Sequence, residues 1–303
     1  SAASDVYKRQ EPSISYSSDG LDFMIPYFKV LSKESDITLA ARNISERGAG
    51  LEGNFRKLHG LNSNLTNVDF LYFDSDKEYE KLYGTSASNR WAFGLKDKYQ
   101  FNQNIRVDVD WSKASDSLVL RDISGEISSI GSERKQSLNQ NITLEAVYEN
   151  FILKIEQQKN QSLNPLLTNG YSKSPSIDLE FSKNLGSFAI YEYLNITNFK
   201  ASELHGFYGN KKSNKYLVNL DEITEGSRIY SDFRIVTNKY FSKAHLQSSF
   251  GIKSIKYNLR DDIKTKNVNV PNFKLIISSM FIKKVNMDTV SYTHLTLPTI
   301  LLV

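Results

Sequence analysis

Apolar and polar residues alternate with a period of two along most of this chain, and this alternation limits the possible folds more than any other feature of the sequence. In the stretch NIRVDVDW the two alternating sets are Ile105, Val107, Val109 and Trp111, and Arg106, Asp108 and Asp110. Successive side chains of a β-strand point to opposite faces, so this stretch forms a strand with one apolar and one charged face. The chain is therefore predicted to be an all-β, antiparallel protein.

The same pattern predicts further strands, separated by polar loops rich in Ser, Asn, Asp and Lys. They are expected at residues 36–42, 51–58, 68–73, 91–101, 187–197, 228–236 and 273–283. Residues 141–157 are predicted to form a hairpin that turns at Glu149 and Asn150. About a dozen strands are expected in all, and no segment shows the 3.6-residue period of an amphipathic helix.

Two architectures explain alternating strands joined by polar loops: a soluble sandwich or barrel, and a transmembrane β-barrel. A soluble sheet with one solvated face gives the same alternation. Three features favour the membrane. The strands are often close to the length of about 9–11 residues that crosses a bilayer, and full charges on one face suit a wet lumen. In addition, aromatic residues occur near strand ends, where they would lie at the membrane interfaces: Trp91, Phe101, Trp111, Phe199, Tyr240 and Phe241.

Both ends of the chain are expected to be artefacts of sequencing. One permitted set of codons for residues 290–299 has a reverse complement that encodes SAASDVYKR, the stretch found at residues 1–9. The encoding DNA also looks like a transposon adapter from a sequencing library, as expected of an assembled environmental read. We therefore exclude residues 1–10 and 290–303 from the fold. Residues 11–289 are interpreted as a partial outer-membrane barrel, and as an internal fragment of a longer chain.

Composition excludes several classes of function. The formal charge of +4 is spread without a basic block, which argues against a nucleic-acid partner. The chain has no cysteine, so disulfide scaffolds and thiolate metal sites are excluded. The histidines outside the tail, His59, His205 and His245, are isolated, and no nucleophile motif such as G-x-S-x-G occurs. We predict no metal, no cofactor and no catalytic residue.

The stretch GAGLEG, residues 48–53, fits the dinucleotide pattern G-x-G-x-x-G, and Asp74 lies further along the chain. That motif must follow a strand and open a helix, because the helix N-terminus binds the pyrophosphate. Here it leads into the alternating stretch LEGNFRKL instead. We interpret these glycines as part of a turn or a barrel strand.

In residues 13–58 a set of residues matches the pattern of one family in order: Pro26, Tyr27, Asp36, Thr38, Leu39, Arg47, Gly48, Phe55, Arg56 and Leu58. The resemblance that they carry is to the LptD (OstA) family of lipopolysaccharide-assembly proteins. Further along it is carried by Arg90, Trp91, Ser115, Asp116, Arg121 and Asp122, and two later stretches, SPSIDLEF and VPNFKLIISSMFIKK, are similar to strands that begin at a proline in the family. These stretches occur in the same order as in the family over most of residues 13–284. The family motif's tryptophan and second proline are replaced here by Lys29 and Lys33.

The resemblance implies an incomplete antiparallel transmembrane β-barrel, about the first half of one with about 26 strands, in the outer membrane of a Gram-negative bacterium. It also implies lipopolysaccharide as the transported molecule, surrounded by outer-membrane lipids. The implied partners are an LptE-like lipoprotein that plugs the lumen and an LptA-like periplasmic bridge that delivers the lipid. In the family the lipid leaves through a lateral gate beside the first strand.

Five residues are candidates for this function, which involves no covalent chemistry. Pro26 and Tyr27 are expected near the lateral gate, where a proline weakens strand pairing because it lacks an N–H. Arg106, Asp108 and Asp110 are expected to face the lumen, where they would contact sugar or phosphate groups. Two alternatives remain open: a passive porin or receptor barrel, and a soluble β-rich adhesion or carbohydrate-binding domain.

Overall fold

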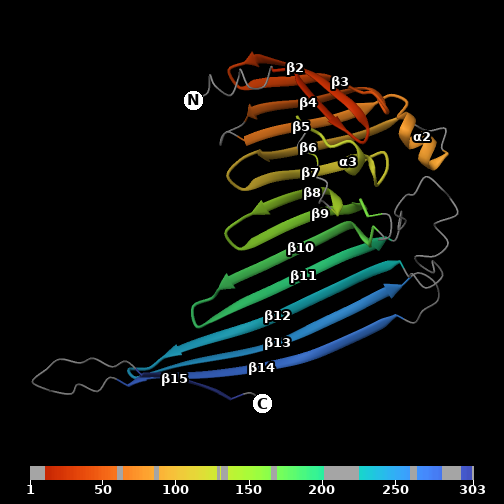
Figure 1. Cartoon of the computed structure of the whole chain (residues 1–303). Helices are drawn as coiled ribbons and strands as arrows, with labels where there is room; N and C mark the ends of the chain where they lie inside the picture. Colours follow the sequence, from red (N-terminus) through yellow and green to blue (C-terminus); the bar gives the residue numbers. More distant parts are fainter. Residues whose placement is uncertain are drawn as a thin grey trace, which may run out of the picture. The chain divides into compact units, whose positions relative to one another are not determined.

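The computed structural model describes residues 11–59, 64–84, 89–127, 130, 136–164, 169–200, 225–259, 265–281 and 295–301. The chain divides into two compact units, one of residues 1–146, 155–175 and 199–225, and one of residues 147–154, 176–198 and 226–303. Within the described residues the strand pairings with a defined register are all antiparallel, and the strand order follows the chain order (Figure 1). The predicted all-β, antiparallel fold class is confirmed.

Most strands contain a segment that the alternation predicts. In chain order the strands are β1 (Ser13–Ser17), β2 (Gly20–Ser32), β3 (Ser35–Ile44), β4 (Gly48–His59), β5 (Asn64–Phe73), β6 (Arg90–Gln100), β7 (Ile105–Ala114), β8 (Ser137–Val147), β9 (Phe151–Ser162), β10 (Ser172–Asn184), β11 (Phe188–Lys200), β12 (Gly226–Tyr240), β13 (Ala244–Leu259), β14 (Lys266–Phe281) and β15 (Leu295–Leu301). The predicted hairpin is confirmed as β8 and β9. The last strand, β15, falls in the tail predicted to be an adapter, residues 1–10 lie outside the described residues, and both adapter assignments stay predictions.

Cross-strand register sorts the side chains of each unit onto two faces. In the first unit one row of paired residues is Asn54, Asp69, Gly94 and Ser112, and the neighbouring row is Phe55, Val68, Leu95 and Trp111. In the second unit the corresponding rows are Arg234, Gly251 and Asn272, and Ile235, Phe250 and Phe273. Directly paired residues share a face. We call the two faces the polar face and the apolar face.

Two short helices, which the search for a 3.6-residue period did not find, interrupt the strands. Helix α2 (Lys77–Tyr83) lies between β5 and β6, and α3 (Val119–Asp122) follows β7. Both are too short for a helical period to show in the sequence. The first turn of α2 is closed by Asp76, whose side chain accepts a hydrogen bond from the backbone N–H of Tyr79 at 3.0 Å. Among the residues that the structure describes, no helix is long and apolar enough to span a membrane.

Both helices lie at one end of the first unit, which we call the loop end because its connections include residues 74–89 and 115–136. At the opposite, turn end, the connections 33–34 and 101–104 are short. At the loop end the segment after β7 folds against the polar face and buries Val119, Leu120, Ile123 and Ile130 beside Phe73. This is the hydrophobic core of the first unit.

The glycines of GAGLEG belong to strand β4, so the expectation of a barrel strand is confirmed and a dinucleotide loop is excluded. Gly48 begins the strand with φ of +129°, a conformation that favours glycine. Aromatic rings cover the other two glycines. A Cβ atom added at Gly50 would lie 2.5 Å from the ring of Phe73, and one at Gly53 would lie 2.2 Å from the ring of Phe70.

Replacing Gly50 with alanine is therefore expected to destabilise the first unit by about 1–3 kcal/mol, the usual cost of overpacking a core. Phe73 is 0% exposed, so its ring has no free space to move into. Denaturant unfolding of the single variant checks the loss. The alanine should cost less in a Phe73→Leu background, since the smaller side chain leaves room. Equal costs in the two backgrounds would contradict the ring contact.

Candidate functional site

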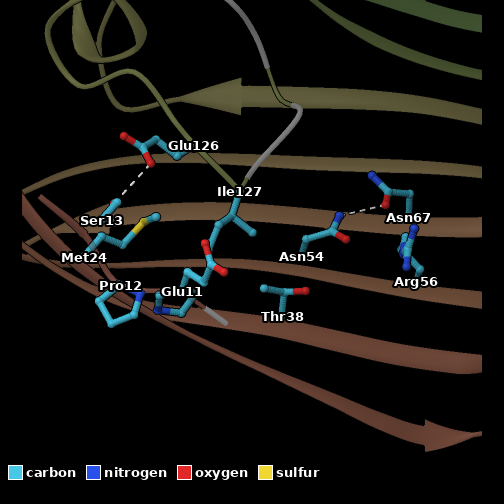
Figure 2. A pocket seen from close by; sticks show the side chains of 11 residues that line it. Glu11, Pro12, Ser13, Met24, Thr38, Asn54, Arg56, Asn67, Glu126 and Ile127 are labelled. Atoms are coloured by element: carbon cyan, nitrogen blue, oxygen red, sulfur yellow. Dashed lines mark hydrogen bonds between the residues drawn. The ribbon is translucent and has the colours of Figure 1, made fainter. Parts of the chain in front are cut away.

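A cavity of about 650 Å³ lies on the polar face of β1 to β5, within the first unit (Figure 2). It is lined by Glu11, Pro12, Ser13, Met24, Pro26, Thr38, Asn54, Arg56, Asn67, Glu126 and Ile127. Five adjacent strands supply most of this lining because alternate residues of each strand point to the same face. Glu126 and Ile127 come instead from the connection between β7 and β8.

The cavity has both apolar and polar walls. Met24 is 5% exposed and lies beside the buried Pro26 on β2. On β4, Asn54 donates from Nδ2 to Asn67 Oδ1 at 2.8 Å and to Asp69 Oδ1 at 2.7 Å. Such a lining offers contacts to an apolar chain and hydrogen bonds to a hydroxyl-rich group in one space.

The two gate candidates point to opposite faces of β2. Pro26 is buried and lines the cavity, whereas Tyr27 is 57% exposed on the apolar face. Strand β1 pairs with β2 only from Gly20 to Met24, so Pro26 comes two residues after the last pair. The structure thus brings Pro26, but not Tyr27, into the cavity. Their role at a gate stays a prediction.

The three charged candidates share a face of β7, as the alternation predicts, but they do not line the cavity. They lie an even number of positions before the buried Ser112 and Ala114, and therefore on the same face of the strand. Arg106 pairs through Nη2 with Glu145 at 3.0 Å and through Nε with Asp108 at 3.6 Å. Asp110 accepts a longer bond from Asn139 at 3.4 Å. Contact of these residues with sugar or phosphate stays a prediction.

A buried ion network at the loop end joins the later motif residues. Arg90 is 0% exposed. It binds Asp116 with two nitrogens, at 3.0 and 2.8 Å, Asp76 at 2.8 Å and Asp122 at 3.1 Å. The Arg90 guanidinium also stacks 4.2 Å from the ring centroid of Tyr79. The network therefore ties α2 and the segment after β7 to the start of β6.

Arg47 extends this network to the first strands. It pairs with Asp76 at 3.1 Å and with Asp19, in the β1–β2 connection, at 3.1 Å. In the sequence, Arg47, Arg90, Asp116 and Asp122 are recognisable only as matches to a family pattern. The ion pairs between them could not be inferred from the sequence, because they join residues far apart along the chain.

Tyr79 is 3% exposed in this network, and its burial, with the negative charge of Asp116, raises the pKa of its phenol to about 12. The phenol of an unfolded chain has a pKa of about 10. The stability that the neutral phenol contributes is therefore complete below pH 10 and is lost as the pH rises from there through about 12. We expect the wild-type chain to lose more unfolding free energy between about pH 9 and pH 11.5 than the Tyr79→Phe variant, measured by denaturant unfolding at both pH values. Equal losses would refute the raised pKa.

Comparison with known protein families supports the resemblance that the motif residues carry. A family model described as LptD, LPS transport system D, matches residues 88–299, which include Arg90, Asp116 and Asp122. The chain belongs to the LptD family. The resemblance inferred from the sequence is thereby confirmed.

Individual LptD proteins are similar over part of their length. LPS-assembly protein LptD of Legionella pneumophila (strain Paris) is 27% identical over 208 residues, which are 62% of this chain and 24% of that protein. The protein of the same name from Salmonella typhimurium (strain LT2) is 24% identical over 276 residues, which are 90% of this chain and 34% of that protein. For the Pseudomonas aeruginosa (strain LESB58) protein the identity is 27% over 170 residues, which are 56% of this chain and 18% of that protein. The chain thus spans about a third or less of these LptD proteins.

Proposed function

We propose that this chain forms part of the wall of an outer-membrane barrel that assembles lipopolysaccharide into the outer leaflet. Membership of the LptD family supports this function, because its named members are LPS-assembly proteins. The single observation that carries it at the level of residues is the cavity with apolar and polar walls beside the first strands. Lipopolysaccharide has acyl chains and sugars, and the cavity offers a surface to each.

The apolar face supports the membrane location. Its residues include the exposed Phe250, Phe273 and Ile277 in the second unit, and a large apolar surface left in water would be costly. Aromatic residues flank the short connections, where an interface would lie: Phe101 is 58% exposed and Tyr240 is 77% exposed. In this proposal the apolar face contacts outer-membrane lipids, and the short connections lie on the periplasmic side.

The finer roles follow from this placement. Pro26, two residues beyond the last β1–β2 pair, would keep the strand edge weakly paired at the lateral gate, with Tyr27 facing the lipid. Arg106, Asp108 and Asp110 would face the lumen. An LptA-like bridge would deliver lipopolysaccharide at the periplasmic side, and an LptE-like lipoprotein would occupy the lumen. The chain would act as a passage and catalyse no reaction.

A chimera tests the proposal. The third of the Salmonella typhimurium protein that this chain matches is replaced by this chain, with a photoreactive amino acid at Met24 in the cavity. We expect ultraviolet light to cross-link the chimera to lipopolysaccharide in cells. The matched control carries the photoreactive residue at Asn139, outside the cavity, and should give much less product. An assembled, protease-resistant chimera in the outer membrane that cross-links equally at both positions would overturn the proposal.

A further inference from the structure

A short segment between two buried anchors lines part of the cavity. Residues 124–127, which we call the strap, follow Ile123, which is 0% exposed, and lead to Ile130, which is 2% exposed. Both isoleucines belong to the hydrophobic core of the first unit. Figure 2 shows Ile127 pointing from the strap into the cavity. The strap belongs to no strand, so it can move without breaking a ladder of strand pairs.

One buried carboxylate holds the middle of the strap. Glu52 on β4 is 0% exposed, and its Oε2 accepts hydrogen bonds from the backbone N–H groups of Glu126 and Ile127, at 3.0 and 3.1 Å. The other carboxylate oxygen, Oε1, pairs with Arg42 on β3. Hydrogen bonds to a charged group are stronger than those between neutral groups, so this contact fixes the backbone of the strap firmly.

Arg42 links the strap to the first strands. Its Nη1 donates to the backbone oxygen of Ser124 at 2.7 Å, while Nε and Nη2 bind Asp22 on β2 at 3.0 and 2.6 Å. Asp22, Arg42 and Glu52 therefore form a continuous relay from β2 through β3 and β4 to the strap. A shift of β2 would pull on the same guanidinium that holds Ser124.

The size of the cavity suggests a function for the strap. A volume of about 650 Å³ lies within the range of about 300–1,000 Å³ that holds a single drug-sized molecule. A glycolipid with several acyl chains and sugars is larger than that. If the cavity is a place where lipopolysaccharide passes, one wall has to move. The strand walls are fixed by their ladders, whereas the strap is held by side-chain contacts to Glu52 and Arg42.

We propose that the strap is a movable wall of the cavity, docked by Glu52 and Arg42, and that its release enlarges the cavity. Glu52 and Arg42 are thus positioning residues. The identity of the ligand rests on the proposed function, but the docking of the strap does not. It is therefore measurable without any ligand.

The test uses the chain's lack of cysteine. Thr38, which lines the cavity and is 4% exposed, is changed to cysteine as a single reporter in the 303-residue chain. Its rate of reaction is measured with a small methanethiosulfonate and with a bulky maleimide. Glu52→Gln is expected to speed the bulky reagent by at least about tenfold, because the neutral amide holds the two N–H groups and Arg42 less strongly. The small reagent should be affected much less.

The matched control is Glu126→Gln: the docking contact to Glu52 uses the backbone N–H of Glu126, while its side chain accepts only a long hydrogen bond from Ser13 Oγ at 3.4 Å, which the amide oxygen of glutamine can still accept. Hydrogen exchange supplies the second readout: the amides of Glu126 and Ile127 should exchange faster in Glu52→Gln, while those of α2 keep their protection and so report an intact fold. Faster labelling and exchange in Glu52→Gln alone would establish the movable wall. Unchanged rates at the strap, or a general loss of protection in place of a local one, would overturn it.

A last arm separates this inference from the proposed function. Lipopolysaccharide in detergent micelles is added to the Thr38→Cys reporter in the wild-type and Glu52→Gln backgrounds. Protection of the cysteine, stronger in Glu52→Gln, supports both proposals. If the strap is released by Glu52→Gln but the lipid protects in neither background, the movable wall stands and lipopolysaccharide is excluded as its ligand.

Discussion

Replacing Arg90 with alanine is expected to lower the free energy of unfolding of the first unit by about 3–5 kcal/mol, the cost of removing one partner from a buried ion pair. Three carboxylates depend on this guanidinium: Asp76, Asp116 and Asp122 lie 2.8 to 3.1 Å from its nitrogens. Asp76 and Asp116 are almost fully buried, so water cannot replace the lost charge. Denaturant unfolding, followed by the fluorescence of Trp91 and Trp111, checks the loss.

The chain offers a matched control for this prediction. Arg106 also forms ion pairs, with two carboxylates, but its side chain is 51% exposed. Arg106→Ala should therefore cost no more than about 1 kcal/mol, as is usual for exposed pairs. Arg90→Lys should recover only part of the loss, because an ammonium group cannot reproduce the two-nitrogen contact with Asp116. Similar small effects at Arg90 and Arg106 would show that the network does not hold α2 in place.

The second large effect concerns the apolar face. Phe250 is 54% exposed and pairs in register with Ile235 and Phe273. If this face lies in a bilayer, Phe250→Arg should destabilise the folded protein by about 2–4 kcal/mol, the cost of a cationic side chain deep in the lipid. On a soluble sheet the same exposed substitution would change stability by only about 0.5 kcal/mol. The folding equilibrium between urea and lipid vesicles measures the difference.

Gln247→Arg is the control for the apolar face. Gln247 lies on the same strand, an odd number of residues from Phe250, and therefore on the polar face. The same charge placed there should be tolerated, since the polar face already carries charged residues such as Arg234 and Lys253. Equal, small effects of both substitutions would favour the soluble alternative. A large effect at Phe250 alone supports the membrane location.

The sequence was sufficient for the sheet because strand alternation is a local property. Phe55 and Asn54 fall on opposite faces whatever their partners are, so the two faces follow from the order of residues alone. The glycines of β4 were also interpreted correctly, since the motif was followed by alternation and not by a helix. The short helices escaped detection, as seven and four residues are too few to establish a period.

The candidate site was predicted only in part. Pro26 was singled out from its place in a family pattern, and the structure adds that it lines a cavity with Thr38 and Asn54. Glu52 was not predicted as a site residue, because it lies within the glycine stretch GAGLEG, which resembles a different motif. Nothing local marks it as the residue that binds the backbone of Glu126, 74 positions away.

The sequence by itself thus determined most of the strands, the division into a polar and an apolar face, and the family. These depend on side-chain spacing along one strand or on short motifs. Only the tertiary structure decided which charges meet: Arg90 with Asp76, Asp116 and Asp122, and Arg42 with Asp22 and Glu52. The physical reason is that a buried charge is tolerated only beside its partners, and those partners come from strands and loops that the fold alone brings together.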